Sequence, residues 1–249
     1  MILRNPDDSS GLESIGALSS QLRTHTYDHV YRRLRRAVAT GQIPDGTRLL
    51  ETDLAARMGV SRTPVRDALR RLQSDGFAER GARGGLWSRA VNMEDIENLF
   101  LVRTNLDALA AQLACETAKP ELWDGPELLL VEMERVIATA GPASTEFSEV
   151  HLAFHASIYR IAFGGRFAAF LDNHLLQYLE VAADLSYRQP SRAHPPVEQH
   201  RQLLADLSSG DVDRAVAAAK RHAQHSATDA KASYHDATLG EELGAPDWI

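Results

Sequence analysis

Two histidines four residues apart, His151 and His155, could bind a metal ion or act as a catalytic pair. Apolar residues such as Phe147 and Phe154 recur around them at three- and four-residue steps, which predicts one helix with both imidazoles on its apolar face. Buried ring nitrogens need hydrogen-bond partners or a metal ion. The pair is therefore consistent with core histidines whose hydrogen bonds are satisfied, with a catalytic pair, or with half of a metal site.

Two later histidines, His200 and His222, also lie on the apolar faces of predicted helices, in VEQHRQLLADL and VDRAVAAAKRHAQH. Four inward histidines in one bundle would repel one another if they were protonated, whereas a divalent cation binds neutral imidazoles. We therefore predict that His151, His155, His200 and His222 bind one divalent transition metal. Zinc or nickel is preferred, because either is stable without redox chemistry. An open coordination position would suit the oxygen of a small carboxylate.

Two further polar residues are predicted to face the same interior and are assigned to effector binding. Arg103 follows Phe100 on an inward stripe, where an unpaired guanidinium is costly, so it either pairs with an acid such as Asp107 or binds an anionic ligand. His174 shares a stripe with Phe170, and it lines the ligand pocket, replaces a metal ligand, or is an ordinary core or half-exposed histidine.

A second constellation is a row of arginines in GVSRTPVRDALRRL, where Arg62, Arg66 and Arg70 recur every four residues. Such a row suits a recognition helix that reads the major groove of DNA from its N-terminal end. Arginine pairs its donors with phosphates and base edges, and the helix N-terminus near Ser61 and Thr63 favours phosphate. The alternative is a solvated helix face with no DNA contact.

The elements that position these residues fall into two segments of opposite charge. Residues 24–90 carry 13 arginines, no lysine and 7 acidic residues, whereas residues 91–249 carry 12 basic and 24 acidic residues. The basic segment predicts three helices followed by a hairpin in FAERGARGGLWSR, whose tip holds Arg83 and Gly84. The acidic segment predicts about six helices separated by breaks that contain Gly or Pro. This asymmetry indicates two domains with different partners.

We therefore predict a mainly α-helical protein, with an N-terminal winged helix-turn-helix followed by an all-helical bundle of about six helices. The expected division is a flexible tail over 1–23, a DNA-binding domain over 24–90, a ligand- and metal-binding domain over 91–235 and a C-terminal tail over 236–249. A single cysteine excludes an internal disulfide framework, and no apolar run approaches the roughly 20 residues of a membrane span. These features, with a start that lacks a signal-peptide core, indicate a cytoplasmic protein.

The stretch GQIPDGTRLLETDLAARMGVSRTPVRDALRRLQSDGF resembles the winged helix-turn-helix of GntR-family bacterial transcription regulators, and the resemblance covers about residues 26–90. It implies a set of DNA-contacting residues in the recognition helix and the hairpin tip: Ser61, Arg62, Thr63, Arg66, Arg83 and Gly84. One position departs from the pattern, because some members place a DNA-contacting arginine where this chain has Thr52.

Residues 93–228 resemble the helical effector domain called FCD, which belongs to the FadR-like branch of the same family. Its metal-binding members carry Asp-x-x-x-His on one helix and single histidines on two later helices, and these histidine positions fall on His155, His200 and His222. His151 stands at the position of the aspartate. The resemblance therefore implies that a site of three histidines and one carboxylate has become a candidate site of four histidines.

Together these features predict a ligand-responsive transcription regulator, a repressor that binds double-stranded operator DNA. A homodimer is expected, because palindromic operators mirror a two-fold protein axis. Effector binding to the helical domain is expected to change the geometry between the two DNA-binding domains of the dimer, here called heads. Two alternatives stay open, a metal-free bundle that binds an acyl ligand and a DNA-targeted metalloenzyme. The chain has no HExxH motif and no evident general base beside its histidines, so no enzymatic activity is expected. No membrane partner is expected either.

Overall fold

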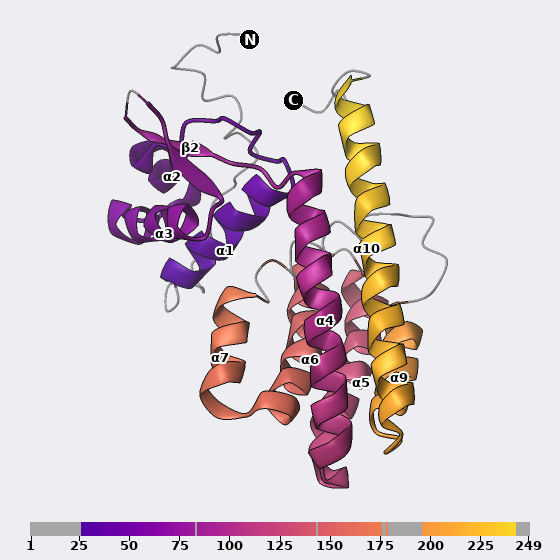
Figure 1. Ribbon diagram of the computed structural model, residues 1–249. Coiled ribbons are helices and arrows are strands. Elements are labelled where there is room, and N and C mark those ends of the chain that lie inside the picture. The colour runs from indigo at the N-terminus through magenta and orange to yellow at the C-terminus, as the bar shows by residue number, and fades with distance from the viewer. Residues whose placement is uncertain (1–25, 83, 143, 176–177, 179–195, 243–249) are drawn as a thin grey trace. The chain divides into compact units, whose positions relative to one another are not determined.

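The computed structural model describes residues 26–242 except for 83, 143, 176–177 and 179–195 (Figure 1). The chain divides into two compact units between Asn92 and Met93, and each unit is described by itself. The predicted N-terminal tail and Arg83 lie outside the described residues. None of the described helices is both long enough and apolar enough to cross a membrane.

The first unit is a winged helix-turn-helix, which confirms the prediction. Its elements in chain order are α1 (Thr26–Ala39), α2 (Glu51–Met58), α3 (Arg62–Ser74), β1 (Ala78–Arg80) and β2 (Leu86–Ser88), and the two strands pair antiparallel. Gly59 ends α2 in the left-handed conformation, with φ of 65°, so the chain turns into α3 without the steric cost of a Cβ. Ser61 takes the N-cap position of α3 with an extended backbone, but its side chain makes no cap hydrogen bond.

The core of this unit forms where α1 packs on α3. The buried apolar side chains recur at three- and four-residue steps along both helices: Val30, Leu34, Val38, Val65, Leu69 and Leu72. Tyr31 adds a polar link, because its hydroxyl donates a hydrogen bond of 2.5 Å to Oδ2 of Asp75. The guanidinium of Arg71 lies 4.2 Å from the centre of the Tyr31 ring. Burial raises the pKa of Tyr31, so its hydroxyl stays a protonated donor.

The second unit is a helical bundle, as predicted. Its elements are α4 (Met93–Thr117), the 3₁₀ helix η3 (Pro120–Trp123), α5 (Asp124–Ala140), α6 (Thr145–Phe163), α7 (Gly165–His174), α9 (Pro196–Leu207) and α10 (Val212–Glu242). Ser144 caps α6 by accepting a hydrogen bond of 3.1 Å from the backbone N–H of Phe147. α10 continues into the segment that was expected to be a tail from residue 236. Residues 226–239 contain no glycine or proline, so nothing in that stretch ends the helix.

Small and large apolar side chains alternate in the core of the bundle. α4 packs along α10, and α5, α6 and α9 lie behind these two helices in the view of Figure 1. Ala111 on α4 and Ala219 on α10 leave room for Phe147 and Phe154 of α6 and for Met133 of α5. Burial of one such large side chain contributes roughly 1.5–3 kcal/mol. Polar groups buried in this core are shielded from water, so they need hydrogen-bond partners within the protein.

Candidate metal centre and nucleic-acid interface

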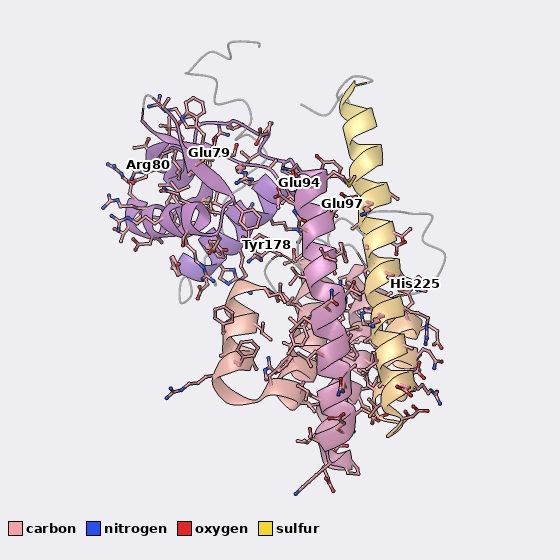
Figure 2. The ribbon with its side chains drawn as sticks, in the orientation of Figure 1. Glu79, Arg80, Glu94, Glu97, Tyr178 and His225 are labelled. Atoms are coloured by element: carbon pink, nitrogen blue, oxygen red, sulfur yellow. The ribbon has the colours of Figure 1, made fainter. Side chains whose placement is uncertain are left out.

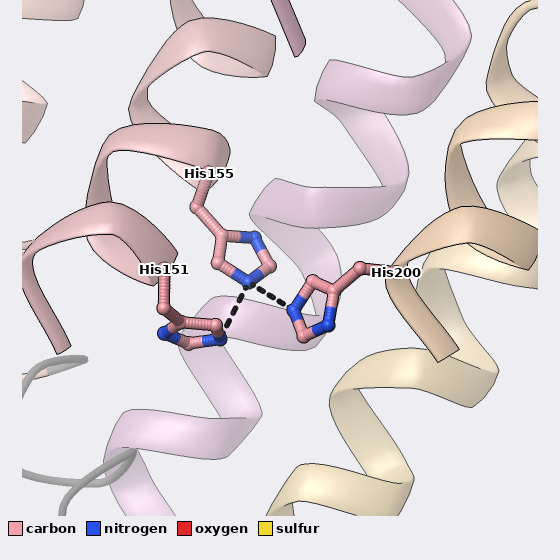
Figure 3. Close-up of side chains that lie close together, drawn as sticks. All are labelled: His151, His155 and His200. Carbon is pink, nitrogen blue, oxygen red and sulfur yellow. Dashed lines mark hydrogen bonds between the residues drawn. The ribbon is translucent and has the colours of Figure 1, made fainter. Parts of the chain in front are cut away.

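Three histidines from two helices meet at one point in the core of the bundle. α6 supplies His151 and His155, one turn apart, and α9 supplies His200, and all three side chains are buried (Figure 3). Nε2 of His155 lies 3.3 Å from Nε2 of His151 and 3.4 Å from Nε2 of His200. One nitrogen from each ring lies within 4.8 Å of the other two. The structure thus brings together three residues that the sequence assigned to a metal.

Two of the three spacings, 3.3 and 3.4 Å, are those of neighbouring ligands on a divalent metal ion, and the third pair lies within 4.8 Å. Nitrogen ligands about 2.0–2.1 Å from a tetrahedral zinc ion lie about 3.3–3.4 Å from one another. A neutral imidazole has one N–H and one lone pair, so Nε2 of His155 cannot form a full hydrogen bond with both of its neighbours. A cation would accept the lone pairs of all three rings at once, and this donor set suits zinc, nickel, copper or iron better than magnesium or calcium.

His222 on α10 lies at the side of this centre. Its ring centre is 4.6 Å from that of His200 and 5.2 Å from that of His155, and its side chain is buried. It does not belong to the group of three whose nitrogens lie within 4.8 Å of one another. All four predicted histidines therefore form one cluster, in which three rings share a centre and His222 adjoins it.

Arg103 on α4 reaches the same cluster. Its Nε donates a hydrogen bond of 3.1 Å to Oδ2 of Asp107, and its Nη2 lies 3.4 Å from Nε2 of His155. Tyr159 donates a hydrogen bond of 2.5 Å to the other carboxylate oxygen of Asp107. Of the two roles that the sequence left open for Arg103, the pairing with Asp107 is present. Sequence reasoning did not identify Tyr159, although its position four residues after His155 places it on the same stripe of α6.

The electrostatics of the site favour a neutral imidazole at His155. Burial lowers the pKa of His155 well below its usual value, and the positive Arg103 lowers it further. Burial raises the pKa of Asp107, while the guanidinium of Arg103 and the hydrogen bond from Tyr159 act in the opposite direction. Burial also raises the pKa of Tyr159 well above its usual value. His155 is therefore a neutral base with a lone pair to share, and Tyr159 is a protonated donor.

Little space remains inside the described part of this site. A cavity of about 20 Å³ lies between His155, Asp107 and Tyr159 and apolar side chains that include Ile158 and Leu203. That volume holds about one water molecule. The side chain of His174, which was assigned to effector binding, lies outside the described residues, although the backbone of α7 ends there.

In the first unit, the predicted DNA-contacting residues of α3 share its exposed face. The exposed side chains are Ser61, Arg62, Thr63, Arg66 and Arg70. The opposite face is buried, through Val65, Ala68, Leu69 and Leu72. Glu51 on α2 accepts from Nη2 of Arg62 at 3.4 Å and from Nε of Arg66 at 3.2 Å. Sequence reasoning did not identify this role of Glu51, because residues 51 and 66 meet only when the turn between α2 and α3 forms.

The hairpin that follows α3 has the form of a wing. Gly84 is exposed near its tip, with φ of 83°, a conformation that side chains other than glycine rarely adopt. A Cβ at Gly81 would lie only 2.3 Å from Nε1 of Trp87, so the indole ring packs directly on this glycine. Figure 2 shows Glu79 and Arg80 on the first strand, and both are exposed. Arg83, predicted to contact DNA, lies outside the described residues.

Comparison with known proteins gives the same division of the chain. The family described as bacterial regulatory proteins, gntR family, matches residues 26–86, and the FCD domain matches residues 98–225. The chain is 27% identical over 199 residues to YdhC of Bacillus subtilis, an uncharacterized HTH-type transcriptional regulator, covering 80% of this chain and 86% of that protein. It is 25% identical over 200 residues to the HTH-type transcriptional repressor RspR of Escherichia coli, covering 78% and 84%.

Solved structures show a similar fold. The structure of McbR/YncC from E. coli superimposes with a TM-score of 0.62 at 21% identity, and the match covers 88% of this chain and 99% of that one. The relatives matched by sequence are transcriptional regulators, as the sequence analysis expected, and not enzymes.

Proposed function

The chain belongs to the GntR family of bacterial transcriptional regulators, in the branch with an FCD domain, and from this premise we propose that it is a metal-dependent, ligand-responsive repressor. The winged helix-turn-helix would bind operator DNA in the cytoplasm. The bundle would hold one divalent transition metal, zinc or nickel, and a small carboxylate effector. Binding of the effector would change the affinity for the operator through a coupling free energy of about 1–3 kcal/mol.

The convergence of three Nε2 atoms at 3.3 and 3.4 Å carries the metal proposal. His151, His155 and His200 would hold the ion, with His222 as a fourth ligand from α10. When bound, the ion would supply a positive charge that attracts an anionic oxygen. Arg103 would be the second anchor of that anion, since its Nη2 lies 3.4 Å from Nε2 of His155.

The exposed arginine row of α3 supports the DNA proposal. Arg62, Arg66 and Arg70 project from the face opposite to the buried one, so the helix could enter a groove without loss of its core contacts. Ser61, Thr63, Gly84 and Arg83 would add contacts to the backbone of the DNA. A repressor role is the proposal that agrees with the name of the E. coli relative RspR.

An exposed apolar face of α4 supports the proposed homodimer. Leu101, Val102 and Leu109 are 66%, 55% and 46% exposed, and with Asn105 they lie within an arc of about 100° on the helix. Light scattering coupled to size exclusion should find a dimer, and Leu101→Glu should produce monomers. Leu128→Glu on α5, where the leucine is 69% exposed, is the matched control and should leave the dimer intact.

The small cavity beside His155 supports a small effector rather than an acyl chain. Ligand pockets for larger molecules have volumes of about 300–1,000 Å³, whereas the described cavity has about 20 Å³. An acyl ligand in this cavity would therefore require the described helices that line it to move apart.

The test uses the untagged full-length chain. Elemental analysis should find about one zinc or nickel ion per chain, and a chelator should remove it. Small carboxylic acids should then raise the melting temperature and change operator affinity only when the metal is present. Protein without stoichiometric metal that still responds to carboxylates would refute the metal proposal, and a response to acyl ligands alone would favour the metal-free alternative.

A further inference from the structure

A chain of buried polar contacts leads from Tyr159 to the histidine centre. The Tyr159 hydroxyl donates to Oδ1 of Asp107 at 2.5 Å, and Oδ2 of Asp107 accepts from Nε of Arg103 at 3.1 Å. Nη2 of Arg103 then lies 3.4 Å from Nε2 of His155. None of the four residues is more than 8% exposed. Each contact in the chain is therefore shielded from solvent and costly to break.

The direction of the guanidinium follows from these contacts. Asp107 holds Arg103 by Nε, while its second oxygen is held by Tyr159. A carboxylate with both oxygens available usually binds the guanidinium by two parallel hydrogen bonds. With Tyr159 bound at Oδ1, the carboxylate is oriented so that Oδ2 accepts from Nε of Arg103, and Nη2 extends toward His155.

Arg103 and a metal ion would compete for the same lone pair. A guanidinium nitrogen only donates, so Nη2 uses the lone pair of Nε2 of His155, which is also the lone pair that a metal requires. A metal ion at His155 would leave a buried cationic donor without that acceptor and next to a second positive charge. A small oxyanion removes both costs, because its oxygen accepts from Nη2 and its charge lies between the two cations.

We propose that Tyr159 and Asp107 are positioning residues that hold Arg103 as a fixed anion-binding arm, so that the metal ion and a short monocarboxylate bind cooperatively. This inference rests on the proposed metal site and adds the residues that couple the two ligands. A short chain is expected, because the adjoining cavity holds about one water molecule.

The test measures zinc affinity of the metal-free, full-length protein by competition with a chromogenic chelator, with and without acetate. In the wild type, acetate should tighten zinc binding by about tenfold, a coupling typical of linked sites. Tyr159→Phe should abolish most of this effect, since Asp107 could then turn both oxygens to Arg103 and withdraw the arm. Zinc affinity without acetate should not fall, because withdrawal of Arg103 also removes its competition for the lone pair of His155.

The matched control is Tyr31→Phe, which removes a hydroxyl from another Tyr–Asp hydrogen bond of 2.5 Å, in the DNA-binding unit. It should retain the full effect of acetate, so a loss in both variants would indicate a general structural effect and overturn the inference. If circular dichroism shows that Tyr159→Phe does not fold, Arg103→Lys tests the same coupling. A lysine keeps the positive charge but lacks the planar guanidinium with its several N–H donors. This variant should therefore also lose the coupling between zinc and acetate binding.

The remaining outcomes separate the two proposals. If the wild type binds no zinc, the metal site itself is wrong and this inference falls with it. If zinc binds but acetate has no effect, or if Tyr159→Phe retains the coupling of the wild type, the metal site stands and the positioning role is overturned.

Discussion

The carboxylate of Glu51 on α2 holds Nε of Arg66 on α3 at 3.2 Å, across the turn between the two helices. The Arg66 side chain remains 45% exposed in this pair. An exposed ion pair contributes at most about 1 kcal/mol to folding. The pair therefore orients the arginine on the proposed DNA-binding face, and it contributes little to the stability of the unit.

Arg66→Ala should weaken specific operator binding by about 1–3 kcal/mol if the guanidinium reads a base edge. The fold should survive, because the buried face of α3 is untouched. A fluorescence anisotropy titration at fixed salt measures the effect. Arg135→Ala on α5, where the arginine pairs with Glu132 on an exposed surface, is the control and should bind DNA like the wild type. Equal affinity of Arg66→Ala and wild type would remove Arg66 from the interface.

Operator affinity should fall steeply as salt rises. The head carries 13 arginines in residues 24–90, and each phosphate contact adds a slope of about −0.9 to the plot of log affinity against log salt for B-DNA. Arg62→Ala should reduce the slope by about one if this residue contacts a phosphate. Titrations of the full-length chain at several salt concentrations measure both slopes. An affinity independent of salt would exclude phosphate contacts by the head.

Gly81→Ala should disturb the wing and weaken DNA binding several-fold. The new Cβ would lie 2.3 Å from Nε1 and 2.8 Å from Cδ1 of Trp87, so the indole has to move and the hairpin has to shift with it. Gly125→Ala on α5 is the matched control, because a Cβ there meets nothing within 4 Å. The control should bind operator like wild type. If both variants bind equally well, the position of the wing does not affect DNA affinity.

The fold could be predicted from the sequence because its signals are local. The steps between Val65, Leu69 and Leu72 define a helix, and Gly59 marks the turn before it. The end of α10 could not be placed in this way. The predicted tail from residue 236 begins as helix, and α10 runs to Glu242, because the stretch before Gly240 lacks a residue that breaks a helix.

The site could be predicted only where its residues share a periodic stripe. His151, His155 and His200 were found because each lies on the apolar face of a helix, and the structure brings them together. Contacts between helices carry no such signal. The hydrogen bond from Tyr159 to Asp107 joins residues that are 52 positions apart, and it depends on how α4 packs against α6. The sequence likewise gives no means to tell that His222 adjoins the centre that the other three share.

Tyr31→Phe should lower the free energy of unfolding by roughly 1.5–3 kcal/mol, the contribution of a hydrogen bond to a charged group. Tyr31 is 1% exposed, and its hydroxyl donates to Asp75 at 2.5 Å. Urea denaturation of Tyr31→Phe, Asp75→Asn and the double variant isolates the pairwise contribution. Additive losses in the double variant would show that the two groups do not stabilise each other.

His155→Ala should abolish the stabilisation of the bundle by zinc. Its Nε2 lies 3.3 and 3.4 Å from the nitrogens of His151 and His200, so its loss removes the central ligand of the proposed centre. Zinc at about 100 times its dissociation constant should stabilise the wild type by about 2.7 kcal/mol, because a ligand that binds only the folded state shifts the equilibrium toward it. Thermal melts with zinc and with chelator measure the difference.

Two further variants separate the metal from other roles of the histidines. His225→Ala, whose exposed side chain is labelled in Figure 2, should keep the full response to zinc. His151→Asp should also keep it, because a carboxylate is a good zinc ligand. Its negative charge would cancel one unit of the positive charge of the ion, so acetate should bind His151→Asp more weakly than it binds wild type. If zinc stabilises His155→Ala as much as wild type, the imidazoles at residues 151 and 155 are core histidines and not metal ligands.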